Sequence, residues 1–127
     1  MTRPGLEQAL TDFGHDIGVE TLAPGPSGAV QLRFDHGATL GFLRQGNDVV
    51  LHWAEPVPYG ACHLLLRAFK RAGDPSPGEP PLQVGLHSAD GTDHLVLATR
   101  LPEQACDARE LHQLTNWLRQ YVAALRD

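Results

Sequence analysis

The sequence predicts a single α+β domain, because its hydrophobic period changes along the chain in the order α-β-β-β-α-β-β-α. The strands come as runs joined by short turns, so we expect a twisted antiparallel sheet. The first and last helices are amphipathic, which favours a place for both of them on one face of that sheet. With 127 residues the chain is long enough for one hydrophobic core, and residues 1–127 are expected to form one domain.

The first helix is predicted over residues 4–16. Pro4 suits a first helical turn, and Gly18 follows the last apolar position. A segment rich in proline, glycine and serine at residues 23–28 then separates this helix from the strands. The apolar side chains at helical spacing are Leu6, Ala9, Leu10, Phe13 and Ile17.

Three strands are expected to follow as a meander. Residues 30–34 alternate between apolar and polar, a turn follows at residues 35–37, and the alternation resumes over residues 39–42. Gly46 and Asn47 then form a pair that suits the positive φ of a tight hairpin.

The third strand begins directly after this hairpin turn and alternates with a period of two. Because proline cannot donate a ladder hydrogen bond, Pro56 and Pro58 are expected to end the strand. One face is formed by Val49, Leu51 and Trp53, and the other by Val50 and His52.

The second helix is predicted over residues 59–72, with Gly73 as its cap. It is apolar around more of its circumference than one sheet requires, because Leu64 and Ala68 lie outside its main stripe. Two explanations stay open: other parts of the same monomer wrap both sides of the helix, or the surplus surface is an oligomer interface. The main stripe consists of Cys62, Leu65, Leu66 and Phe69.

The proline-rich segment at residues 73–81 is expected to form a mobile surface loop. A second hairpin follows it, in which residues 82–86 and 95–101 alternate on either side of an Asp90-Gly91 turn.

The last helix is predicted over residues 107–126. Asp107 followed by Glu110 has the aspartate form of a capping box, which marks a helix start. The broad apolar stripe of this helix consists of Leu111, Leu114, Leu118, Tyr121, Val122 and Leu125.

The charge and the composition exclude several classes of protein. The net charge is −5, which disfavours a nucleic-acid partner, and the helix dipole explains the basic cluster at residues 67–71. The apolar runs are too short for a membrane span and the N-terminus lacks a secretory signal, so we expect a cytoplasmic protein. Cys62 and Cys106 are expected to act as small buried or half-buried hydrophobic residues.

The sequence contains no recognisable catalytic or cofactor motif, so we expect a binding protein with no cofactor, no metal and no enzymatic activity. Its seven histidines do not pair at a metal-binding spacing. His87 and His94 flank the second hairpin and could approach each other across it. An enzyme that uses His52, His87 or His94 is a third-ranked hypothesis, and it requires these side chains to converge in one pocket.

The chain resembles the class I type III secretion chaperones, the Tir chaperone family that guards individual bacterial effectors. The element order, the size and the acidic charge all agree with this family. The matching stretches are residues 10–14 and 17–19 in and after the first helix, 32–35 in the first strand, 64–68 in the second helix, and Leu101-Pro102, Asp107, Leu111 and Trp117 near the C-terminus.

The resemblance implies a homodimer joined largely through the second helix, with Cys62, Leu65, Leu66 and Phe69 at the interface. It also implies that the dimer binds the N-terminal segment of a secreted effector in extended form and keeps it secretion-competent. The alternative is a small binding or regulatory domain of the same fold that serves no secretion system. The expected effector contacts are Leu6, Leu10 and Phe13 on the first helix and Val50, His52 and Val96 on the sheet, with core packing as the competing explanation, above all for Leu10 and Phe13.

Overall fold

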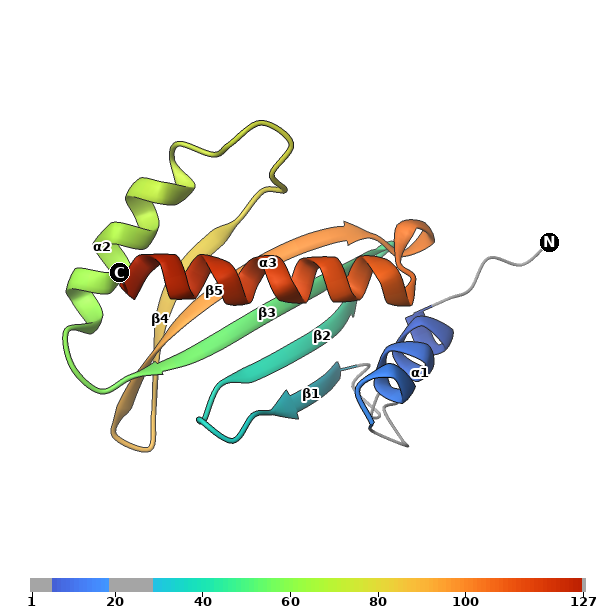
Figure 1. The fold of residues 1–127 in the computed structure, drawn as a ribbon, viewed down its shortest axis with the longest axis horizontal. Helices are drawn as coiled ribbons and strands as arrows, with labels where there is room; N and C mark the ends of the chain where they lie inside the picture. The colour runs from blue at the N-terminus through green and yellow to red at the C-terminus, as the bar shows by residue number, and fades with distance from the viewer. Residues whose placement is uncertain (1–5, 19–28, 127) are drawn as a thin grey trace.

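The computed structural model describes residues 6–18 and 29–126, and its element order is the predicted one (Figure 1). Residues 4 and 5 of the predicted first helix and the segment at 23–28 lie outside the described residues. The elements are α1 (Leu6–Asp16), β1 (Ala29–Arg33), β2 (Thr39–Gln45), β3 (Asp48–Val57), α2 (Ala61–Ala72), β4 (Gln83–Ala89), β5 (Thr92–Pro102), the 3-10 helix η1 (Glu103–Ala105) and α3 (Ala108–Arg126).

The strands form one antiparallel five-stranded sheet in the order β1-β2-β3-β5-β4. Both predicted tight hairpins are present. Gly46 has a φ of 62° in the turn between β2 and β3, and Asp90 and Gly91 have φ of 52° and 76° between β4 and β5. Two consecutive positive φ values suit the right-handed twist of the paired strands, which is why Asp-Gly turns favour hairpins.

The third strand ends directly before Pro58 as predicted, but Pro56 does not end it. β3 continues through Pro56 to Val57, and Pro56 pairs with His94 of β5. The reason lies on the other side of the strand, where pairing with β2 ends at Ala54. Pro56 therefore has a neighbouring strand on one side only, and a proline is tolerated at such an edge-like position.

The three helices lie against one face of the sheet (Figure 1). α3 crosses the sheet and contacts β3, α1 packs against α3, and α2 closes the other end of the layer by contacting β4, β5 and α3. The core face of β3 is the predicted one, because Val49, Leu51 and Trp53 are all buried. In the described part of the chain no helix packs on the opposite face, which we call the outer face.

The start of α3 has the predicted cap. The Asp107 carboxylate accepts a hydrogen bond of 2.8 Å from the Glu110 backbone N–H, which satisfies one of the free donors of the first turn. α3 has 19 residues, yet neither it nor another helix described here is apolar enough over a sufficient length to cross a membrane.

Candidate binding surfaces

Helix α2 has one face in the core and one face in solvent. Leu64 and Ala68 are buried, whereas Leu66 is 60% exposed and Phe69 is 50% exposed. Of the two explanations for the surplus apolar surface, wrapping of both sides within the monomer is therefore wrong for the described residues. Cys62 is exposed on the same side as Leu66, which corrects its expected burial.

The exposed face of α2 continues onto its surroundings. Tyr59, just before the helix, is 90% exposed. β4 is an edge strand that contacts α2, and its Leu86 is 37% exposed on the helix-bearing side of the sheet, opposite the buried Leu95. We call the exposed apolar side chains of α2 and of the segments next to it, Tyr59, Leu66, Phe69 and Leu86, the α2 surface. Exposed apolar side chains gathered in one place are typical of a protein-binding surface.

The outer face carries the predicted sheet residues. Val50, His52 and Val96 are all half-buried there, on the neighbouring strands β3 and β5. His52 and Val96 line a broad hollow of about 830 Å³ whose lining includes small residues such as Gly85 and Ala98. Burial lowers the pKa of His52 from its ordinary value. The hollow offers a helix-free, mostly uncharged sheet surface.

The three predicted effector contacts on α1 occupy the core. Leu6, Leu10 and Phe13 are 1%, 0% and 2% exposed, so they present almost no surface to a partner in this structure. The physical reason is that α1 turns the face that carries these three side chains and Ala9 toward the core, whereas Ile17 just after the helix stays partly exposed. The Phe13 ring packs edge-on against Phe42 at 5.7 Å and lies 4.6 Å from the His112 ring. Core packing, the competing explanation, accounts for these residues.

A trough between α1, α3 and the β1–β2 turn was not predicted. It consists of two adjoining hollows of about 410 and 710 Å³ that share Phe34 and Arg119. The Arg119 guanidinium lies 5.7 Å from the centre of the Phe34 ring and 5.9 Å from that of Trp53. Ile17, 42% exposed, lies at one end of this trough. No local sequence motif indicates this trough, because its residues come from segments far apart in the sequence.

A buried carboxylate lies at the other end of the trough. Glu55 is 4% exposed and accepts a hydrogen bond of 2.9 Å from Trp53 Nε1. His36 Nε2 and Arg126 Nη1 each lie 3.4 Å from its oxygens. Buried charges need such partners. The sequence did contain a signal here, because Glu55 continues the core-facing alternation of Val49, Leu51 and Trp53 as a charged residue.

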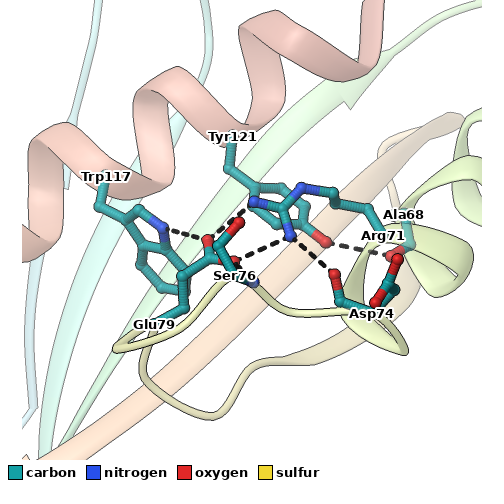
Figure 2. Close-up of polar contacts among 7 residues, drawn as sticks. All are labelled: Ala68, Arg71, Asp74, Ser76, Glu79, Trp117 and Tyr121. Atoms are coloured by element: carbon teal, nitrogen blue, oxygen red, sulfur yellow. Dashed lines mark hydrogen bonds and ion pairs between the residues drawn. The ribbon is translucent and has the colours of Figure 1, made fainter.

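The proline-rich loop lies on the surface as expected, and one of its residues, Glu79, is joined to two helices by contacts that were not predicted. Arg71 of α2 pairs with both Glu79 oxygens at 2.9 Å, and Trp117 Nε1 of α3 donates to Glu79 Oε2 at 2.9 Å (Figure 2). The Ser76 backbone N–H also donates to Glu79. The Arg71 guanidinium first, then the Ser76 N–H and the Trp117 N–H, lower the pKa of Glu79 to about 2. We call these four residues the Glu79 latch.

The histidines among residues 6–18 and 29–126 do not form a metal site. His87 and His94 are direct cross-strand partners, as their flanking positions suggested. No group of three possible ligands forms anywhere in those ranges. The other cysteine, Cys106, is 1% exposed as expected, and burial together with nearby carboxylates raises the pKa of its thiol to about 11.

A sheet with one helix-covered face, one helix-free face and an exposed apolar helix defines a small protein-binding domain. The sequence model of the family described as "Type III secretory system chaperone SycN" matches residues 5–124. The chain belongs to this family of type III secretion chaperones. Membership implies a role in binding rather than in catalysis.

Solved structures with the same fold include chaperone complexes. A chain of the complex of the Yersinia pestis type III secretion chaperone SycH with a stable fragment of YscM2 matches with a TM-score of 0.69, 15% identity and coverage of 94% of this chain and 98% of that one. The HopA1–SchA chaperone–effector complex gives a TM-score of 0.64 at 17% identity, covering 93% and 90%.

The fold is also found outside the secretion chaperones. YbjN of E. coli, a putative transcription regulator, gives a TM-score of 0.57 at 13% identity, covering 91% of this chain and 84% of that one. Identities this low show the fold alone. No curated protein sequence matches the chain.

Proposed function

We propose that this protein is a homodimeric chaperone that binds the N-terminal segment of a type III secreted effector in the bacterial cytoplasm and keeps it soluble and secretion-competent. The observation on which the proposal rests is the family match over residues 5–124. On the resemblance noted in the sequence, the proposal includes membership of class I, the Tir chaperone group.

The proposed dimer interface is the α2 surface together with Cys62 and Leu65 of the same helix. Leu66 and Phe69 belong to that surface, Cys62 is exposed, and Leu65 is half-buried against the core. Leu66 and Phe69 have half or more of their surface free, and they stand beside the edge strand β4. A twofold axis through such a surface makes it self-complementary, because each subunit offers the same side chains to the other. Burial of these residues in a dimer would remove the largest exposed apolar cluster on α2 from water.

The effector segment is proposed to lie in extended form over two surfaces. Val50, His52 and Val96 supply contacts on the outer face, where the small residues of the hollow allow a close approach. The trough supplies the second surface, where Ile17 and the Arg119 guanidinium flank the edge strand β1. An added strand at β1 would gain main-chain hydrogen bonds, while the trough would receive alternate side chains.

The experiment that tests the proposal is co-purification from the native cell, with identification of whatever stays bound. The expected result is a dimer of about twice the 13.8 kDa monomer mass in a stable complex with the N-terminal region of a larger secreted protein. A protein that is strictly monomeric at micromolar concentration and retains no secreted partner contradicts the proposal.

A second candidate function is a binding or regulatory domain that serves no secretion system, and it is favoured by the fold similarity to YbjN. Under this alternative the same surfaces bind a regulator instead of an effector. Co-purification distinguishes the two by the identity of the partner, and the genes that neighbour the coding sequence provide an independent check.

A further inference from the structure

The end of α2 that carries Phe69 has few apolar anchors. The buried residues of this helix are Ala61, Leu64 and Ala68, two of which are only methyl groups beyond the backbone. Only Ala68 belongs to the C-terminal half, where it is fixed through its carbonyl, which accepts a hydrogen bond of 3.1 Å from Tyr121 Oη of α3. Small anchors allow close packing, yet they bury little apolar area to hold a helix end in place.

The Glu79 latch supplies a second attachment between the end of α2 and α3. Its carboxylate joins three elements: the last turn of α2 through Arg71, the loop through the Ser76 N–H, and α3 through Trp117 (Figure 2). The side chain of Glu79 is only 14% exposed, and the Arg71 guanidinium also lies 5.4 Å from the centre of the Tyr121 ring. A bidentate arginine–carboxylate pair fixes orientation as well as distance.

From this geometry we infer that Glu79 is a positioning residue for the α2 surface: it holds the C-terminal turn of α2 against α3 and thereby sets where Phe69 and Leu66 meet a second copy of the chain. This inference rests on the proposed homodimer. Loss of the carboxylate leaves the Arg71 guanidinium and the half-buried Trp117 N–H without their partner, and the end of α2 becomes free to move away from α3.

The test compares Glu79→Ala, Glu79→Gln and Trp117→Phe with the wild-type protein. Trp117→Phe keeps an aromatic ring and removes the N–H donor to Glu79 together with part of the indole ring, which also packs against Tyr121. Two measurements are made on each: hydrogen exchange of the amides at residues 68–73, and the dimer dissociation constant by sedimentation. We expect faster exchange confined to that segment and a dissociation constant raised about tenfold for Glu79→Ala, with smaller effects for the other two.

Two controls separate positioning from general loss of stability. Asp48→Ala removes an exposed ion pair with Arg100 that lies on β3 and β5, away from α2. Val49→Ala removes buried methyl groups from β3, and it should lower the thermal midpoint without changing exchange at the end of α2 or the affinity of the dimer.

The outcomes distinguish failure of the positioning role of Glu79 from failure of the proposed dimer. Variants that dimerise like the wild-type protein, or that exchange normally at residues 68–73, overturn the inference while the proposed function stands. A wild-type protein that is monomeric at every concentration overturns the proposed dimer and with it the positioning role, even where exchange still changes. Should Glu79→Ala fail to fold, Glu79→Gln and Trp117→Phe decide the question.

Discussion

The imidazole ring of His52 occupies the space that a side chain on Gly41 would need. A Cβ at residue 41 would stand 1.9 Å from His52 Nε2, far inside van der Waals contact. The two residues face each other as a cross-strand pair between β2 and β3. Glycine at position 41 therefore leaves the space on the outer face that the His52 ring occupies, and this ring lines the hollow.

Gly41→Ala is expected to destabilise the protein by about 1–3 kcal/mol, because the added methyl group forces the half-buried ring of His52 out of its place. The free energy of unfolding from urea titration measures the effect. Gly85→Ala is the matched control, because a Cβ at this position on the same face meets nothing within 4 Å. Equal stability of the two variants would contradict the packing described for His52.

Leu66→Asp is expected to turn the proposed dimer into a folded monomer, because it places a charge in the apolar centre of the α2 surface. Leu66 is 60% exposed, so the monomer itself should lose little stability. Sedimentation velocity and circular dichroism measure the two effects. Gln113→Asp adds the same charge to an exposed position of α3 and should leave the dimer intact.

Stability is expected to depend on pH through His52. Burial lowers its pKa below the ordinary value of 6.5, so folding favours the neutral ring. The stability that the neutral ring contributes is fully present above pH 6.5 and is lost as the pH falls through that value toward the lowered pKa. Between about pH 7.5 and pH 5.5 the free energy of unfolding should fall more steeply for the wild-type protein than for His52→Gln.

Arg119→Ala is expected to weaken effector binding about threefold to tenfold, because it removes the guanidinium that lies over Phe34 and Trp53 in the trough. Titration calorimetry with the N-terminal segment of the co-purified effector measures the dissociation constant. Arg109→Ala removes an exposed arginine from the first turn of the same helix and should bind as tightly as the wild-type protein. Equal losses in both variants would indicate a general charge effect instead of a contact in the trough.

The order of the elements could be predicted because period and turn chemistry are local properties. Asp107, Gly46 and Asp90 act within a few residues of themselves, and each is found in its predicted role. Whether an apolar side chain lies in the core or on the surface was harder to predict. An apolar stripe on α1 looks the same whether it faces α3 or a partner, so the burial of Leu6, Leu10 and Phe13 could not be decided by spacing.

The structural features that the sequence did not predict depend on contacts between residues that are distant in sequence. Pro56 remains within a strand because β2 ends its pairing early, which no signal near residue 56 reveals. The Glu79 latch depends on Trp117, 38 residues away, and the trough depends on Arg119 folding back over Phe34. The sequence showed that α2 carries apolar side chains on two sides. It could not show that Leu66 and Phe69 are exposed, because this depends on where β4 and α3 pack.

The strand order has a consequence for how many partners the chain can hold at once. β1 and β4, the two edges, are separated by four inter-strand spacings, or roughly 19 Å. In the proposed assembly, a second copy at the β4 end and an added strand at the β1 end would therefore not compete for the same backbone. The proposed dimer would then offer two equivalent β1 edges, one from each subunit.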